Sequence, residues 1–314
     1  MLKYIGKRLV GVIPVLLGVS ILVFLIMQLT PGDPALIILG PKASQTALEN
    51  LRHQLGLDLP IHTQYIRWVT NIIQGDWGYS IHYKHRVIDL ILQRLSATML
   101  LTVCALFIST TFGIFAGIVS ATKQYSWQDR VLMTMALIGF CLPVFWLALI
   151  MQFFFSIRLG VLPVSGLHSP GINTVLDTLW HLILPAFTLA VGTMATIARM
   201  TRGSMLEVVR QDYIRTARAK GVNSRQISIK HALRNALIPV VTVVGSQFGY
   251  LLSGEVLLEI VFNWPGLGSL MIGGILARDF PLVQGIILFV ATIYVVVNLL
   301  VDLAYSALDP RITY

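Results

Sequence analysis

The stretch that decides the fold runs from Leu9 to Thr30, reads LVGVIPVLLGVSILVFLIMQLT and contains no charged residue. A helix needs about 20 apolar residues to cross the hydrocarbon core of a bilayer. Lys3, Lys7 and Arg8 precede the run, as in a signal peptide. However, the run exceeds an apolar signal region of about 7 to 15 residues, and no A-x-A cleavage pattern follows it. The sequence therefore predicts an uncleaved first transmembrane helix.

The composition of the whole chain agrees with a membrane protein. Its 314 residues are 56% hydrophobic and only 12% charged, with a mean hydropathy of +0.78, whereas soluble domains carry about 25% charged residues. A soluble monomer of this size could not bury so much apolar surface. A soluble enzyme, a disordered chain and a secreted disulfide-rich protein are excluded.

Five further apolar runs complete the expected set of spans. They are about Met99–Thr122, Val131–Ile157, His181–Ala198, Ala236–Val256 and Leu282–Ala307. The runs are continuous, whereas the strands of a transmembrane barrel alternate apolar and polar residues. We expect an all-α, polytopic membrane protein with six transmembrane helices.

The net charge of +9 is distributed unevenly between the two sides of this six-span topology. The segments on the side of the N-terminus carry +3, +1, +7 and −1, and those on the other side carry +1, 0 and −2. Short loops rich in Lys and Arg remain in the cytoplasm. We therefore expect both termini in the cytoplasm and the excess charge on that side.

The first connection, about Pro31–Thr98, is expected to be a small helical subdomain outside the membrane. Asp33-Pro34 has the pattern of an N-cap followed by proline at the first helical position. Thr46-Ala-Leu-Glu49 fits a capping box, and Gly56 suits the end of that helix. A second helix is expected between Pro60 and Gly75.

This second helix has one apolar face, formed by Ile61, Tyr65, Trp68 and Ile72 at spacings of four, three and four. Two interpretations of the face remain open. It packs on the other helices as a cap, or it forms a wall at which substrate enters or a delivery protein docks.

The fourth connection, about Arg199–Asn235, is long and strongly basic. An apolar stripe at helical spacing is formed by Leu206, Val209, Tyr213 and Ala217. Gly221 can end that helix, and Asn223 or Ser224 can cap a second one that leads into the fifth span. The pair of helices either lies on anionic lipid or docks a cytosolic partner.

Two segments of this connection resemble the signature loop of the permeases of binding-protein-dependent ABC importers. They are Asp212-Tyr-Ile-Arg-Thr-Ala-Arg-Ala-Lys-Gly221 and His231-Ala-Leu-Arg-Asn-Ala-Leu-Ile-Pro239. The superfamily pattern is Glu-Ala-Ala, three residues and Gly, and Arg215 departs from its glutamate. The downstream proline also comes later than in sugar importers. Both departures resemble the dipeptide, oligopeptide and nickel branch.

Further motifs extend the resemblance along nearly the whole chain. They are Pro31-Gly-Asp-Pro34, Leu55-Gly-Leu-Asp58, Gly75-Asp-Trp-Gly-Tyr-Ser80, Leu159-Gly-Val-Leu-Pro163, Phe262-Asn-Trp-Pro-Gly-Leu-Gly268, Arg278-Asp-Phe-Pro281, Asn298-Leu-Leu-Val-Asp302 and Asp309-Pro-Arg-Ile312. The chain is most similar to the permease type with a large outer subdomain after the first span. The resemblance implies the type I importer fold, with residues 1–30 as first span, 31–98 as outer subdomain and 99–314 as permease core with its coupling loop at 199–235.

The resemblance also implies an assembly in the bacterial inner membrane. The partners would be a homologous second permease in a heterodimer, two cytosolic ATP-binding subunits, an extracytoplasmic substrate-binding protein and membrane lipid, without nucleic acid. The residues implied at the ATP-binding subunit are Tyr213, Arg215, Thr216, Ala217, Arg218, Lys220, Gly221, Arg225, His231 and Asn235. ATP would be hydrolysed by the partner subunits, because this chain has no G-x-x-x-x-G-K-[ST] loop.

We expect neither catalytic residues nor a cofactor nor a metal site in this chain. Gly266-Leu-Gly268 lacks the third glycine of a dinucleotide loop, because Met271 stands there. His82 and His85 are the only close pair of histidines, and no cysteine or carboxylate clusters with them before Asp89.

Polar residues in, or next to, the last two expected spans are candidates for the pathway or its gate. They are Glu255, Glu259, Ser246, Gln247, Asn263, Asn298 and Asp302. For the glutamate pair, the alternative is a pair of interfacial carboxylates that face water. For Asp302, the alternative is a bond to a neighbouring helix.

Small peptides, including glutathione, are the expected cargo, and a nickel or metal-chelate importer is the alternative. An intramembrane enzyme would need a catalytic cluster, and the sequence contains neither H-E-x-x-H nor paired intramembrane aspartates. A stand-alone secondary transporter would not need a long basic cytosolic loop.

Overall fold

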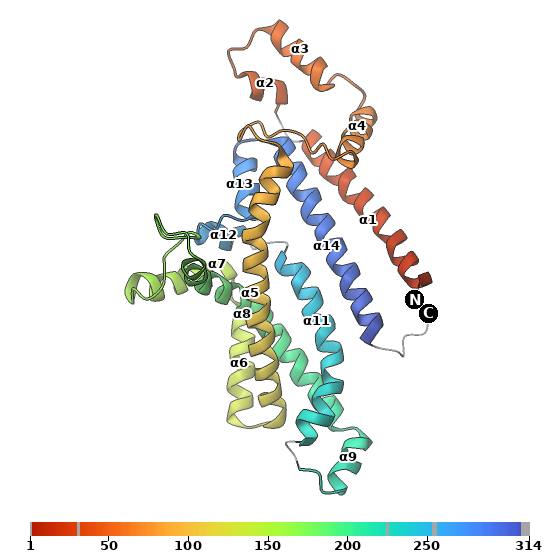
Figure 1. Cartoon of the computed structure of the whole chain (residues 1–314), viewed down its shortest axis with the longest axis vertical. Coiled ribbons are helices and arrows are strands. Elements are labelled where there is room, and N and C mark those ends of the chain that lie inside the picture. Colours follow the sequence, from red (N-terminus) through yellow and green to blue (C-terminus); the bar gives the residue numbers. More distant parts are fainter. Residues whose placement is uncertain (1, 30–31, 224–225, 253–255, 309–314) are drawn as a thin grey trace. The chain divides into compact units, whose positions relative to one another are not determined.

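The computed structural model describes residues 2–29, 32–223, 226–252 and 256–308. Apart from a single β-bridge between Tyr79 and Arg86, all regular elements in these ranges are helices (Figure 1). The chain divides into two compact units, Met1–Ser96 with Gly266–Val295 and Ala97–Pro265 with Val296–Tyr314. The division expected from topology, at residues 30 and 98, stays a prediction.

Within the described residues, five helices are long and apolar enough to cross a membrane. They are α1 (Leu2–Leu29), α5 (Val87–Thr122), α8 (Val175–Val209), α11 (Arg234–Leu252) and α14 (Phe280–Leu308). They fall on the first, second, fourth, fifth and sixth of the expected spans. Their length and composition confirm a polytopic helical membrane protein.

The third expected span, Val131–Ile157, is not one straight helix. The chain forms α6 (Trp127–Cys141), then α7 (Val144–Met151) and the π-helix η1 (Gln152–Arg158), with a bend of 107° between α6 and α7. Pro143 cannot donate a backbone hydrogen bond, and it forces the preceding Leu142 into extended backbone with ψ of 130°. Counted as one broken span, these helices bring the total to six.

In the first unit, three short helices follow α1. They are α2 (Pro34–Leu39), α3 (Gln45–Leu55) and α4 (Ile61–Ile73). As predicted, the Asp33 side chain caps α2 through the Ala35 N–H, and Gly56 ends α3 in the left-handed conformation. The predicted capping box at Thr46 is wrong, because Ser44 caps α3 through the Ala47 N–H.

The predicted apolar face of α4 packs against α1. The rings of Tyr65 and Trp68 lie 5.5 and 5.9 Å from that of Phe24, and the Tyr65 hydroxyl is 2.8 Å from Ser20 Oγ. Ile61, at the start of the face, remains exposed. These contacts favour the interpretation of the face as a packing surface.

A buried carboxylate joins two distant motifs of the first unit. Asp279 caps α14 through the Leu282 N–H at 3.3 Å, and it accepts hydrogen bonds from Ser80 Oγ at 2.5 Å and the His82 N–H at 2.9 Å. Around it, apolar side chains of α5, α14 and α13 (Leu267–Leu276) form a core. The Gly75–Ser80 and Arg278–Pro281 motifs are therefore two halves of one packing site.

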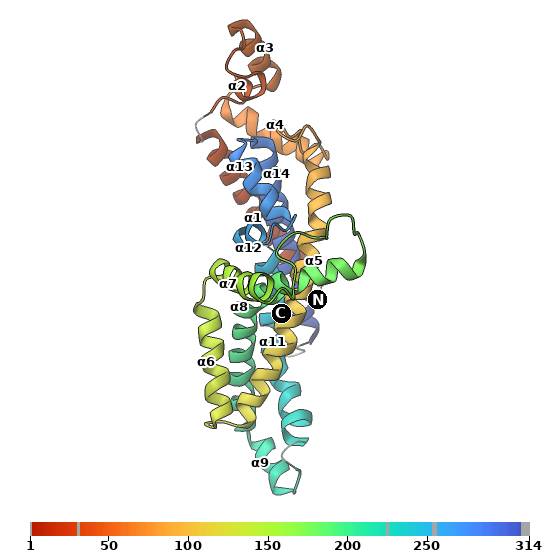
Figure 2. The ribbon, with the colours of Figure 1, turned by 90° about the vertical axis from the view of Figure 1, so that its left-hand side faces the viewer.

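In the second unit, α8 is the central helix, with 67% of its most apolar window buried. Helix α5 approaches it closely at Gly117, where an added Cβ would lie 2.5 Å from Thr201 Cβ and 2.8 Å from the Ala198 carbonyl oxygen. Gly113, four residues earlier, meets Ile197 in the same way. This small-xxx-small spacing lets two backbones pack face to face, and α6 lies along another side of α8 (Figure 2).

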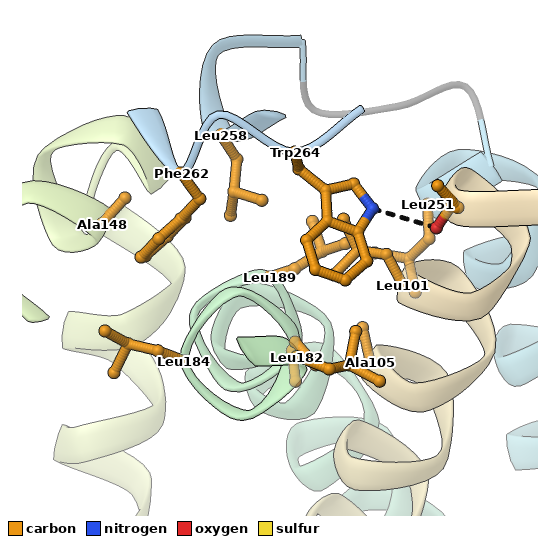
Figure 3. Close-up of a cluster of buried hydrophobic side chains, with 13 residues drawn as sticks. Leu101, Ala105, Ala148, Leu182, Leu184, Leu189, Leu251, Leu258, Phe262 and Trp264 are labelled. Atoms are coloured by element: carbon orange, nitrogen blue, oxygen red, sulfur yellow. Dashed lines mark hydrogen bonds between the residues drawn. The ribbon is translucent and has the colours of Figure 1, made fainter. Parts of the chain in front are cut away.

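A hydrophobic core closes the other end of this unit, where α12 (Val256–Val261) leads into the Phe262–Gly268 motif. Phe262 and Trp264 are buried among leucines and alanines of α5, α7, α8, α11 and α12, and the Trp264 indole donates to the Ala97 carbonyl at 3.0 Å (Figure 3). These two aromatic residues of the motif are therefore core residues.

Candidate functional site: the connection between α8 and α11

Helix α8 extends past the expected span, His181–Ala198, into the first part of the basic connection. It continues through Arg199 and Arg202 to Val209, and the short helix α9 (Asp212–Ala219) follows after a break at Gln211, whose ψ is 151°. Both views show α9 beyond the end of α8 (Figures 1 and 2).

The predicted stripe of Leu206, Val209, Tyr213 and Ala217 is wrong in detail, because the break divides it between two helices. The buried positions are Met205 on α8 and Ile214 on α9. The extended residue at the break shifts the phase of the helical repeat, so a periodicity counted through it selects neighbouring positions.

Helix α9 ends in a Schellman motif at Gly221. The Gly221 N–H donates to the Arg218 carbonyl at 3.0 Å, and the Val222 N–H donates to the Ala217 carbonyl at 3.2 Å. Gly221 has φ of 79°, and a Cβ there would meet nothing within 4 Å. The glycine is therefore required by backbone conformation and not by space, as the predicted corner implied.

A small buried core holds α9 and the π-helix η2 (Ile227–Leu233) against α8. Its fully buried members are Met205, Ile214, Ile227, Ala232 and Ala236. Ala121, from the last turn of α5, and Val222, from the glycine corner, pack against them. The connection is thus a folded element with its own apolar base.

Tyr213 ties α9 to the start of α11. Its hydroxyl accepts a hydrogen bond from Asn235 Nδ2 at 2.7 Å and donates to the His231 carbonyl at 3.4 Å. Tyr213, His231 and Asn235 are all among the residues implied at the ATP-binding subunit, and the structure brings them together although they are up to 22 positions apart.

The outer surface of α9 is exposed and basic. Arg215 is 77% exposed, with Nη1 3.5 Å from Asp212 Oδ1, and Arg218 and Lys220 are also exposed. An exposed pair at this distance contributes little to stability, so these cations are available to a partner surface. Thr216 donates to the Asp212 carbonyl at 3.0 Å and Ala217 is half-buried, whereas Arg225 lies outside the described residues.

Beside this element lies an ion pair that the sequence did not reveal, formed by a buried aspartate and the Arg202 side chain, which is 26% exposed. Asp129, in the first turn of α6, is 4% exposed. Its Oδ1 accepts a hydrogen bond from Arg202 Nε at 2.8 Å, and its Oδ2 accepts one from Arg202 Nη2 at 2.9 Å. The Tyr125 N–H donates to Oδ2 at 2.9 Å, and the Ser120 hydroxyl donates to Oδ1. In the sequence, Asp129 stands in a short charged loop between two apolar runs, and no residue near it indicates Arg202.

The pathway candidates have different environments. Glu259 is 1% exposed and accepts from Thr98 Oγ1 at 3.3 Å, and Gln247 accepts from Thr193 Oγ1 at 3.2 Å. Ser246 donates to the Val243 carbonyl of its own helix at 2.8 Å. Their role in a pathway stays a prediction.

The remaining candidates lie in the loop before α13, in α14 or outside the described residues. Asn263 is exposed with φ of 47°, and Asn298 is half-buried in α14. Asp302 also lies in α14, and Glu255 lies outside the described residues.

No three His, Cys, Asp or Glu side chains gather as metal ligands within the described residues. The His82 ring packs edge-on against Tyr83, and its backbone N–H binds the Asp279 carboxylate.

Comparison with known proteins identifies the family. A model of the inner membrane component of binding-protein-dependent transport systems matches residues 113–314, and a model of the N-terminal part of such components matches residues 1–102. The chain belongs to this family. It is accordingly a multi-pass inner-membrane permease subunit of an ABC importer.

Relatives match the chain over its full length. It is 44% identical over 314 residues to the glutathione transport system permease protein GsiC of Escherichia coli (strain K12), and 45% identical to that of Pectobacterium atrosepticum, with all of each chain covered. Among solved structures, an inward-facing MetNI methionine ABC transporter aligns with a TM-score of 0.58 at 19% identity, over 71% of this chain and 97% of that one. That likeness confirms the fold of an ABC importer permease.

Proposed function

We propose that this permease forms half of the pathway of an importer for small peptides, with glutathione as its cargo. The observation that supports this cargo is the 44% identity to a glutathione transport permease, which extends over the full length of both chains. A homologous second permease forms the other half, and an extracytoplasmic binding protein delivers the peptide.

The α9–η2 element is the contact with a cytosolic ATP-binding subunit. Its inner face is anchored on α8 by a buried core, while its outer face presents Arg215, Arg218 and Lys220. Guanidinium groups bind carboxylates and carbonyls on a partner surface. When ATP closes the two ATP-binding subunits, the element moves and the permease changes between two discrete packings.

This assignment places both chain termini in the cytoplasm, where the positive charge gathers. It also places the 31–98 subdomain outside and the 99–314 core in the membrane. Glu259 and Gln247 remain the best candidates for contacts along the pathway, because each accepts a hydrogen bond from a threonine on another helix.

The test is ATP-driven uptake by the complete transporter reconstituted in liposomes, with labelled glutathione, a labelled dipeptide and nickel as separate substrates. We expect glutathione uptake that requires ATP and the loaded binding protein. Uptake of nickel alone would show the metal importer of the same family, and uptake without ATP-binding subunits would refute the proposal.

Gly221→Asp tests the coupling element. The aspartate is strained at this φ and adds a negative charge to the basic face, so uptake per ATP should fall on the order of tenfold. Gly171→Asp is the matched control, because Gly171 also has positive φ, of 81°, and empty space around its Cα. Equal effects of the two substitutions on uptake per ATP would contradict the assignment.

A further inference from the structure

The carboxylate of Asp129 is saturated with donors. Each oxygen accepts two hydrogen bonds, Oδ1 from Arg202 Nε and the Ser120 hydroxyl, and Oδ2 from Arg202 Nη2 and the Tyr125 N–H. A carboxylate offers about four such acceptor positions in total. The bidentate geometry fixes the guanidinium plane as well as its position.

These donors come from three separate parts of the second unit. Ser120 lies in the last turn of α5, Tyr125 in the connection that follows, and Arg202 on α8, 73 positions from the aspartate on α6. The ends of α5, α6 and α8 and the connection between α5 and α6 therefore all contribute to a single charged site.

The site borders the base of the α9–η2 element on two sides. Arg202 lies one helical turn before Met205, and Ser120 is next to Ala121; both Met205 and Ala121 belong to the core that anchors α9 and η2. Immediately behind it, Gly117 holds α5 against Thr201 of α8 without room for a methyl group. A displacement of α9 thus reaches α5 and α8 through packing. Helix α6 packs along α8 as well, with Gly139 tight against Val191, and Asp129 adds a charged, bidentate contact at the start of α6, next to the α9–η2 element.

We propose that the Asp129–Arg202 ion pair is the positioning element that holds the first turn of α6 to α8 when the α9–η2 element is displaced, so that this end of the two helices moves as one. It sets how many substrate molecules cross per ATP hydrolysed. This inference rests on the proposed coupling function and names the internal link through which the helices respond.

The experiment compares Asp129→Asn with wild type in the complete transporter, using labelled glutathione as the probe. The amide keeps the shape but loses the charge and two acceptor positions. We expect ATP hydrolysis stimulated by the binding protein to persist, while uptake per ATP falls on the order of tenfold, within the range of coupling between sites. Arg202→Lys keeps the charge but lacks the planar fork, so its loss should be smaller.

Asp279→Asn is the matched control. It neutralises a second buried aspartate, in the first unit, and should leave uptake per ATP unchanged whatever it does to stability. An unchanged ratio in Asp129→Asn, or an equal loss in Asp279→Asn, would overturn the inference. So would failure of both Asp129→Asn and Arg202→Lys to assemble with the ATP-binding subunits, since the pair would then be a folding element.

A distance measurement provides a readout independent of transport. Spin labels at Val131 on α6 and Glu207 on α8, both exposed, with Cys104 and Cys141 replaced by alanine, should give one narrow distance distribution with and without ATP. In Asp129→Asn the distribution should broaden with ATP, and an unchanged width would count against the inference. If the wild type itself shows no ATP-driven uptake, the proposed function fails. If the wild type transports normally and Asp129→Asn has the same uptake per ATP, only the proposed role of the ion pair is refuted.

Discussion

Asp129 and Asp279 are both buried aspartates that join distant parts of the sequence, but they do so with different partners. Asp129 meets the charged fork of Arg202 across 73 positions, whereas Asp279 accepts from the Ser80 hydroxyl across 199 positions and from two backbone N–H groups. The first lies beside the basic α9–η2 element, and the second caps α14 in the first unit.

The difference teaches how each site responds when it loses a partner. Removing one member of a buried ion pair leaves an uncompensated charge, while removing a neutral donor leaves an unsatisfied acceptor. The charged site should therefore be the more sensitive of the two, and a partly exposed pair such as Asp33 with Arg52 should be less sensitive than either.

The largest effect is expected for Arg202→Ala, which leaves the Asp129 carboxylate buried without its counter-charge. We expect a loss of about 3 to 5 kcal/mol in the free energy of unfolding. Thermal or denaturant unfolding of the purified permease in detergent measures it. Arg215→Ala, at an ion pair that is 77% and 97% exposed, is the control and should change stability by less than about 1 kcal/mol.

A smaller effect is expected for Asp279→Asn. The amide keeps one acceptor oxygen but puts an NH2 group, itself a donor, in place of the other. The free energy of unfolding should therefore fall by about 1 to 3 kcal/mol. Hydrogen exchange of residues 77–87 and 279–283 measures the local loss of stability. Ser80→Ala removes a neutral donor and leaves the Asp279 carboxylate in place, so it is the direct counterpart of Arg202→Ala. If Ser80→Ala destabilises the protein as strongly as Arg202→Ala, the contrast between charged and neutral partners does not govern the effect.

The smallest effect concerns pH at the pair of Asp33 and Arg52, whose Nη2 and Oδ2 atoms are 2.6 Å apart. Partial burial raises the pKa of Asp33, but hydrogen bonds from Arg52 and the Ala35 N–H, together with the Arg52 charge, outweigh it and lower the pKa below its ordinary value. A lowered pKa stabilises the folded state above the unfolded value of about 3.9, and this contribution is lost as pH falls below it.

Hydrogen exchange of α2 and α3 at pH values from 6 to 3 tests this pH dependence. Protection of these helices should fall at the acid end by less than about 1 kcal/mol, because the pair is partly exposed. Asp33→Asn should remove that change. An identical acid response in the variant would show that another group titrates.

Features that depend on local sequence were predictable. The spans follow from apolar length, the cap at Asp33 from its proline, and the corner at Gly221 from the backbone conformation that glycine allows. The capping serine of α3 and the phase of the stripe across Gln211 were missed, because each depends on one or two residues at a helix boundary.

Features that depend on pairing of distant segments were not predictable. Nothing near Asp129 in the sequence indicates Arg202, and nothing near Ser80 indicates Asp279. Pro143 and the Gly113-x-x-x-Gly117 spacing did carry signals for the bend after α6 and for the close approach of α5 to α8.

The length of α8 has a mechanical consequence. Its 35 residues correspond to about 50 Å of helix at 1.5 Å per residue, about 20 Å more than the hydrocarbon core of a bilayer. Pro185 removes a backbone hydrogen bond within the helix, and the arm from there to Val209 is about 36 Å long. A bend of about 5° at that pivot would sweep the end of the arm through about 3 Å, more than half the pitch of a helix.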